Sequence, residues 1–215
     1  MKGIVPFSID ELDGFNVNKD GEPEVIYQPL YHYQAYPAAG FTGPLLFFQT
    51  QIGATGILLE DTNLRTAGRM PTPKNAALVG IEVFFRPGST PSATGAIVAA
   101  NLNDVNAVHG GRMSLSLRIG DKTYLEEAPL GAMPMQFRVD GIAALSDTTT
   151  AAASRVTVQS YAAFCGPAYQ LVPMRLIANQ EFSVTINSPA AVALPSGVAG
   201  TIGVRLAALQ YRLAQ

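Results

Sequence analysis

Histidine is the side chain most often used for proton transfer and metal binding near neutral pH, and this chain has two, His32 and His109. Metal sites of the cupin type need closely spaced histidines together with a carboxylate, whereas these two lie far apart in the sequence. His109 precedes Gly110-Gly111, which predicts a surface loop. A lone general base also needs an oriented partner, and the sequence reveals none. We predict that neither histidine is catalytic.

Residues 16–21, Asn-Val-Asn-Lys-Asp-Gly, match the first half of a calcium-binding loop, in which oxygen ligands alternate and a glycine makes the turn. The twelfth position of such a loop requires a bidentate glutamate, and here it is Tyr27. Glu22 and Glu24 are misplaced for that role. The segment is therefore predicted to be a polar turn, and calcium calorimetry is the measurement that would decide between the two interpretations.

The remaining acidic and hydroxyl residues form no recognisable catalytic motif. Glu60-Asp61 and Glu126-Glu127 are adjacent in sequence, and neighbours on a strand point to opposite faces, so these pairs do not predict a shared acid–base site. The sequence has no Gly-x-Ser-x-Gly elbow, phosphate-binding glycine loop or dinucleotide fingerprint. These observations predict a protein that is not an enzyme and that uses no cofactor, metal ion or small-molecule substrate.

Two further features are expected to be structural. Arg65, Arg69 and Lys74 form a modest basic stretch without a stacking aromatic residue, which favours a solvated loop over a nucleic-acid or membrane site. Cys165 is the only cysteine, so the chain forms no intrachain disulfide and no thiolate metal cluster. Its small and apolar neighbours predict that it is buried.

The composition combines a hydrophobic fraction of 48% with a charged fraction of 14%. Few charges indicate either a surface that neighbouring subunits cover or a large core under many small residues, and composition leaves both open. The net charge of −2 gives no general attraction for nucleic acid or anionic lipid. Residues 1–24 contain six acids and two lysines, a balance of −4, which leaves +2 for the rest. No signal peptide or membrane-spanning run is apparent, so we expect assembly in a reducing cytoplasm.

The elements expected to position these residues are strands. Residues 1–40 contain many turn-forming pairs and are predicted to be an extended N-terminal arm that its tyrosines anchor to a surface. From residue 41 to 215, short apolar runs alternate with turn residues, which predicts an all-β domain of about eight antiparallel strands, a single jelly-roll β-sandwich. The expected strands are residues 45–52, 56–59, 78–86, 113–119, 122–126, 181–187 and 200–206, the last with an extension to Arg212.

Some segments are ambiguous. Residues 96–102 fit a strand or a short helix, and residues 148–164 fit a loop followed by a strand. No long amphipathic helix and no internal repeat are evident. The strand at 78–86 should end at Pro87-Gly88, and Phe84 within it is expected to be a core residue.

Residues 61–71 contain a Thr62-Asn63 turn and a Gly68-x-x-Pro71 loop and are followed by the strand that begins near Ala77. This stretch resembles jelly-roll capsid proteins of small icosahedral bacterial viruses, including tailless phages with an internal membrane. Residues 169–174, 179–184 and 203–212 are similar as well. Double jelly-roll capsid proteins are usually longer, so a single jelly roll fits this chain better.

The resemblance implies a virion structural protein whose arm ties neighbouring subunits together. Its implied partners are copies of itself and other virion proteins, with contact to an internal membrane or the packaged genome left open. Its implied location is the virion, after assembly in the host cytoplasm. The alternatives are a non-viral β-sandwich module that binds a glycan or a peptide and, last, an enzyme with a dispersed active site. A stable monomer that binds a glycan would favour the module.

Overall fold

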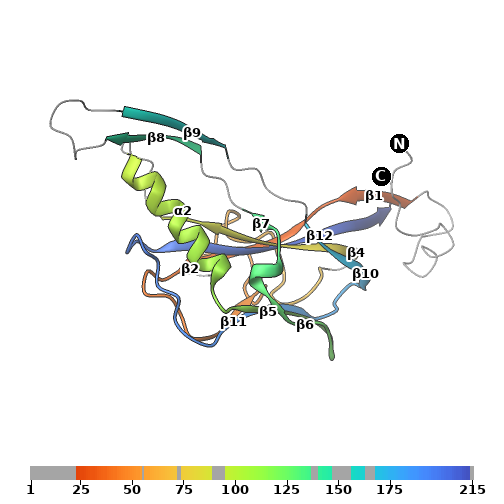
Figure 1. The fold of residues 1–215 in the computed structure, drawn as a ribbon. Helices are drawn as coiled ribbons and strands as arrows, with labels where there is room; N and C mark the ends of the chain where they lie inside the picture. The colour runs from red at the N-terminus through yellow and green to blue at the C-terminus, as the bar shows by residue number, and fades with distance from the viewer. Residues whose placement is uncertain are drawn as a thin grey trace.

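The computed structural model describes residues 23–54, 56–71, 74–88, 95–136, 140–146, 156–162 and 168–213. Within these residues, two antiparallel sheets face each other as a β-sandwich, with one α-helix beside them and a separate hairpin that projects from the body (Figure 1). The all-β prediction is therefore confirmed.

The six-stranded sheet has β12 (Gly200–Leu213) and β4 (Asn75–Arg86) at its centre. On one side of β12 lie β1 (Pro23–Tyr27) and β2 (Leu30–Tyr36), which pair with its end and its beginning. On the far side of β4 lie β10 (Tyr169–Leu176) and the short parallel strand β7 (Met135–Gln136). The prediction that β4 ends before Pro87-Gly88 is confirmed. The predicted extension of the last strand to Arg212 is confirmed as well, since β12 ends at Leu213.

The four-stranded sheet has the order β3 (Gly43–Phe47), β11 (Phe182–Ser188), β5 (Ser114–Ile119) and β6 (Lys122–Pro129). Strands β5 and β6 form the hairpin that the sequence predicts, with Gly120 in the turn at φ +57°. A second pair, β8 (Asp140–Ser146) and β9 (Val156–Ala162), forms the projecting hairpin. Strand β9 agrees with the strand predicted in the second part of residues 148–164, whereas β8 was not expected. The loop predicted before β9 lies outside the described residues.

The main strands pair in a nested order. Among the eight strands β2, β3, β4, β5, β6, β10, β11 and β12, the first pairs with the eighth, the second with the seventh, the third with the sixth and the fourth with the fifth. Two further pairings, β12 with β4 and β11 with β5, join these four pairs into the two sheets. The result is one long hairpin of strand pairs wrapped into a sandwich.

The core lies between the sheets and follows the two-residue period of the strands. Alternate side chains point inward and are buried, while their neighbours along the strand face outward. The inward residues include Ile81, Val83 and Phe85 of β4, Leu115, Leu117 and Ile119 of β5, Val184 and Ile186 of β11, and Ile202, Val204 and Leu206 of β12. Burying each of these side chains contributes about 1.5–3 kcal/mol to stability.

Helix α2 (Gly95–Gly110) closes one side of the sandwich. It runs from the projecting hairpin toward the four-stranded sheet (Figure 1) and contacts β8, β4 and a short 3-10 helix, η2 (Leu130–Ala132). Its residues Val105 and Val108 join the core together with Leu130. The ambiguous segment 96–102 is thus the first half of a 16-residue helix. The sequence showed no long amphipathic helix, and this helix was missed because its small apolar residues follow no clear helical period.

Part of the predicted arm is sheet. Strands β1 and β2 occupy residues in the 23–36 region, where turn-forming pairs had indicated irregular structure, and Leu30, His32 and Tyr36 of β2 are buried. Local turn signals were outweighed by pairing with β12, which lies at the other end of the sequence. Residues 1–22 of the arm lie outside the described residues, so their role stays a prediction.

Two expected strands are also corrected. The strand predicted at 45–52 ends at Phe47, because Phe48 adopts a left-handed conformation at φ +66° that a strand cannot continue. The strand predicted at 56–59 is a turn, in which Leu58 accepts backbone hydrogen bonds from Asp61 and Thr62.

Candidate functional site

His32 lies on β2 and is buried, with 3% of its surface exposed. Its Nδ1 accepts a hydrogen bond from the Phe48 N–H at 2.5 Å, so the ring proton resides on Nε2, which lies 3.2 Å from Thr50 Oγ1. The rings of Phe47 and Phe48 pack against it edge-on. Burial lowers the pKa of His32, and the nearby Asp61 carboxylate partly opposes this shift. Both ring nitrogens are occupied by protein groups, so the imidazole positions the backbone of Phe48.

His109 lies in the last turn of α2 and is also buried, with 4% exposed. The prediction of a surface loop was wrong. It belongs to the buried stripe Asp104, Val105, Val108 and His109, whose spacing places one helix face against the core. Neither ring nitrogen has a hydrogen-bond partner among the described residues. Burial without a partner lowers the pKa of His109 to about 4, so the ring is neutral near pH 7.

Asp104 is the second polar group of this stripe. Its Oδ1 accepts a hydrogen bond from the Ser196 N–H at 2.9 Å, which fastens the loop before β12 to the helix. Its Oδ2 has no partner within the described part of the chain. The Tyr36 hydroxyl donates a hydrogen bond to the Val192 carbonyl of the same loop at 2.7 Å. Two side chains, one from β2 and one from α2, therefore hold the loop in place.

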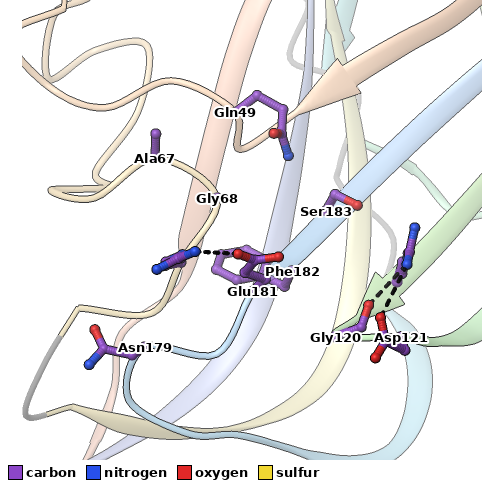
Figure 2. Close-up of a pocket in the computed structure, with 11 residues that line it drawn as sticks. Gln49, Ala67, Gly68, Gly120, Asp121, Asn179, Glu181, Phe182 and Ser183 are labelled. Atoms are coloured by element: carbon purple, nitrogen blue, oxygen red, sulfur yellow. Dashed lines mark hydrogen bonds and ion pairs between the residues drawn. The ribbon is translucent and has the colours of Figure 1, made fainter.

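A polar pocket of about 680 Å³ lies at the end of the four-stranded sheet where β5 turns into β6 and β11 begins (Figure 2). Arg69 pairs with Glu181, and Arg118 lies 3.5 Å from Asp121. All four side chains are at least half exposed, so each pair contributes little to stability. The remaining polar groups that line the pocket come from Gln49, Asn179 and Ser183.

This pocket offers hydrogen bonds but no catalytic pair. Ser183 is the only hydroxyl residue among the described residues that line it, and neither a histidine nor a cysteine accompanies it. Phe182 is buried and therefore provides no exposed aromatic platform. The pocket can accept a polar group, such as a sugar hydroxyl or a peptide backbone.

The basic stretch and the acidic pairs singled out in the sequence lie in different places in the fold. Arg69 of the basic stretch lies in the pocket, whereas Arg65 and Lys74 are exposed and do not line it. The Asp61 carboxylate accepts the Leu58 N–H, and the Glu127 N–H donates to Ser116 Oγ.

The polar turn predicted at 16–21, where half of a calcium-loop motif occurs, and Cys165, which was predicted to be buried, lie outside the described residues. Where the structure is described, no three histidine, cysteine or acidic side chains gather closely enough to hold a metal ion. Among those same residues, no helix is long and apolar enough to span a bilayer.

The outer face of the six-stranded sheet carries a cluster that the sequence did not predict. Gly203 lies between Tyr33 and Phe84 in the strand register, and the two rings meet over it with centroids 6.1 Å apart. A side chain at Gly203 would overlap the Tyr33 ring, which explains the glycine. The Arg205 guanidinium lies 5.0 Å from the centre of the Phe84 ring, and its Nε donates to Glu82 at 2.5 Å.

This cluster corrects the expectation that Phe84 is a core residue. Phe84 is half-buried on the outer face, and the adjacent Phe85 is the one that enters the core. The run of apolar residues in β4 hides the alternation, so the sequence could not tell the two faces of the strand apart. The cluster links three neighbouring strands, β2, β12 and β4.

Comparison with known proteins gave no match: no family model, curated protein or solved structure is similar to this chain.

Proposed function

We propose that this chain is a virion structural protein, a capsid shell subunit built as a single jelly roll with an N-terminal arm. The observation that carries the proposal is the nested pairing of the eight main strands. A jelly roll has eight strands in two sheets, and wrapping one long hairpin of strand pairs generates that arrangement. Viral capsid proteins, lectins and cupins share this architecture, so the choice between them rests on side chains.

The side chains favour a structural role over a cupin role. Cupin chemistry needs histidines that are free to bind a metal ion, whereas here both nitrogens of His32 are occupied by Phe48 and Thr50. His109 is buried against the core on another element. His32 thus serves the fold, and the two histidines lie on separate elements, β2 and α2.

The segment that resembles capsid proteins lies between β3 and β4. Residues 61–71 precede β4, the first long core strand, and the Thr62-Asn63 turn binds the edge of β2. Thr62 is fully buried and donates its hydroxyl hydrogen to the Tyr31 carbonyl at 3.0 Å. This segment supports the proposal because it connects the two sheets in the order that a jelly roll requires.

The proposed partners are copies of the chain itself and other virion proteins. Residues 1–22, which precede β1, would supply the arm, and the proposed location is the virion. The second candidate is a β-sandwich module that binds a glycan or a peptide, and the polar pocket around Gln49, Asn179 and Ser183 favours it.

The test is the mass of the purified protein in solution, measured by light scattering, with negative-stain images of the same fractions. We expect rings, capsomers or shells. A strict monomer over a wide range of concentration and salt would contradict the capsid proposal. A monomer that also binds a glycan array, and loses that binding when Asn179 is changed to Ala, would establish the binding module instead.

A further inference from the structure

The polar pocket beside the β5–β6 turn has the size of a small-molecule site. Its volume of about 680 Å³ lies within the range of about 300–1,000 Å³ that is typical of such sites. Three uncharged polar residues from separate segments line it (Figure 2). They are Gln49 in the loop after β3, Asn179 in the turn before β11 and Ser183 on β11.

These three side chains have hydrogen-bonding groups that the fold does not use. The amides of Gln49 and Asn179 and the hydroxyl of Ser183 form no hydrogen bond with another described residue. An amide donates through its NH₂ group and accepts through its oxygen, and a hydroxyl does both. The pocket therefore offers donors and acceptors together to a ligand.

The charged side chains of the pocket are already paired. Two ion pairs line it, Arg69 with Glu181 and Arg118 with Asp121. Arg65 and Lys122 are exposed and follow or precede these segments closely in the sequence, but they do not line the pocket. Because each charge in the described lining lies beside an opposite charge, recognition depends on neutral hydrogen bonds.

The pocket has little apolar surface. Ala67 and Phe182 are the apolar residues among the described lining residues with a side chain beyond glycine, and Phe182 is 3% exposed. A lipid, an aromatic compound or an apolar peptide side chain would bury little surface here, so hydrophobic burial does not drive binding. The ligand is therefore polar over most of its surface.

The main chain of the pocket wall is also paired, which disfavours an extended peptide as the ligand. The Gly68 N–H donates to the Phe48 carbonyl at 2.7 Å, and the Phe182 N–H donates to the Gly68 carbonyl at 2.9 Å. The Gly120 N–H donates to the Glu181 carbonyl at 2.8 Å. Addition of a peptide strand needs free main-chain groups, so this wall does not support it.

Hydrogen bonds hold the turn that carries Asn179. The Met70 N–H donates to the Gln180 carbonyl at 3.1 Å, and the Asn179 N–H donates to the Met70 carbonyl at 2.9 Å. Asn179 adopts φ +61°, in the left-handed region where asparagine is enriched among residues other than glycine. An amide on such an ordered turn loses little entropy when it binds a ligand.

We infer that this pocket binds a saccharide through the side chains of Gln49, Asn179 and Ser183. A sugar is polar over most of its surface, and each of its hydroxyl groups both donates and accepts. Binding at one pocket does not require assembly, so the inference goes beyond the capsid proposal and is tested separately from it. Within the second candidate function, it selects the glycan over the peptide.

A glycan array probed with the unchanged full chain identifies the saccharide, and saturation-transfer NMR then measures its affinity. The NMR signal comes from the ligand, so a monomer and a large assembly are both suitable samples. We expect a Kd of about 1 mM for one site, because no described lining residue supplies an exposed aromatic platform. Raising the salt concentration tenfold should change this Kd less than about twofold, because no ionic contact is made.

Two variants locate the site. Gln49→Ala and Asn179→Gly each remove one amide, and glycine keeps the left-handed backbone of residue 179. Each should weaken binding about three- to tenfold, as expected for one lost hydrogen bond. Asn187→Ala is the matched control, because Asn187 is an exposed amide on β11 that does not line the pocket, and its binding should be unchanged. Urea unfolding establishes that all three variants fold.

Three outcomes would overturn the inference. Saccharide binding that both pocket variants retain would place the site elsewhere. Binding of sialylated or sulphated glycans alone, with a Kd that rises steeply with salt, would show that charge governs recognition. Failure of every glycan on the array to bind would leave the pocket without the inferred ligand. Light scattering of the unchanged protein decides the capsid proposal, so the failure of either proposal is recognised without the other.

Discussion

The surroundings of His32 and His109 differ although both imidazoles are buried. His32 lies at an edge strand, where Nδ1 accepts the Phe48 N–H, Nε2 faces Thr50, and two aromatic rings pack around it. His109 lies at the end of a helix, and no described residue bonds to either of its ring nitrogens. Burial lowers the pKa of both.

The difference shows what a buried polar group can do for a fold. The His32 ring accepts the backbone N–H of Phe48, whose left-handed conformation ends β3 and starts the loop that leads to the turn at Leu58. The His109 ring loses its hydration on burial and gains no hydrogen bond from the described residues. Its burial therefore lowers the stability of the fold, and the packing of the surrounding core offsets this loss. Three experiments address this contrast.

The largest effect is expected for His32→Ala. The change removes the ring from between Phe47 and Phe48 and leaves the Phe48 N–H buried without an acceptor, which should cost about 3–5 kcal/mol. The measurement is urea unfolding at pH 8 and matched protein concentration. His32→Asn is the control, because its Oδ1 can replace Nδ1 as acceptor, and it should recover part of the loss. A cost below about 1 kcal/mol for His32→Ala would remove the distinction between the two histidines.

Acid should destabilise the protein through His109. Its pKa is about 4 in the folded chain and 6.5 in the unfolded chain, so the unfolded chain binds more protons between these values. Stability therefore falls as the pH is lowered through this window, by up to about 3 kcal/mol once the pH is below the folded pKa. His32, whose pKa is also lowered, acts in the same direction.

The measurement is the free energy of unfolding from pH 8 to pH 4, compared between the unchanged protein and His109→Leu. The difference between the two curves isolates His109 from the carboxylates and from His32. Parallel curves would show that the pKa of His109 is not lowered, because the protonated ring donates to a hydrogen-bond acceptor in the folded state.

The smallest effect is expected for His109→Leu at pH 8. Leucine has a similar volume and carries no polar atoms, so stability should change by less than about 1 kcal/mol or increase. Urea unfolding beside His109→Gln, which keeps a buried polar group, provides the control. A loss above about 2 kcal/mol would indicate that the ring has a partner, and the contrast with His32 would fail.

The regular strands could be predicted from the sequence because only one face of each strand is buried, so apolar and polar residues alternate. The predicted strands at 113–119 and 181–187 match β5 and β11, where alternate residues are buried. The β4 strand was found as well, yet its continuous apolar run concealed which of Phe84 and Phe85 faces the core. Periodicity identifies a strand, but it assigns faces only where polar residues alternate with apolar ones.

The candidate sites depended far more on long-range contacts. The scarcity of histidine and the absence of a recognisable catalytic motif are properties of the sequence alone. The burial of His109, the binding of His32 to Phe48 and the placement of Arg69 beside Glu181 each join residues from different elements. No local sequence pattern predicts contacts between residues that lie far apart in the chain.

The sequence by itself determined that the chain is built from strands, with turns at positions such as Gly120 and a break after Arg86, because these features follow from the conformational preferences of single residues and from a two-residue period. Only the tertiary structure decided that residues near the N-terminus pair with β12, that a helix covers one side, and that polar side chains from separate segments line one pocket. Those outcomes are set by which surfaces bury each other, and burial depends on the whole chain at once.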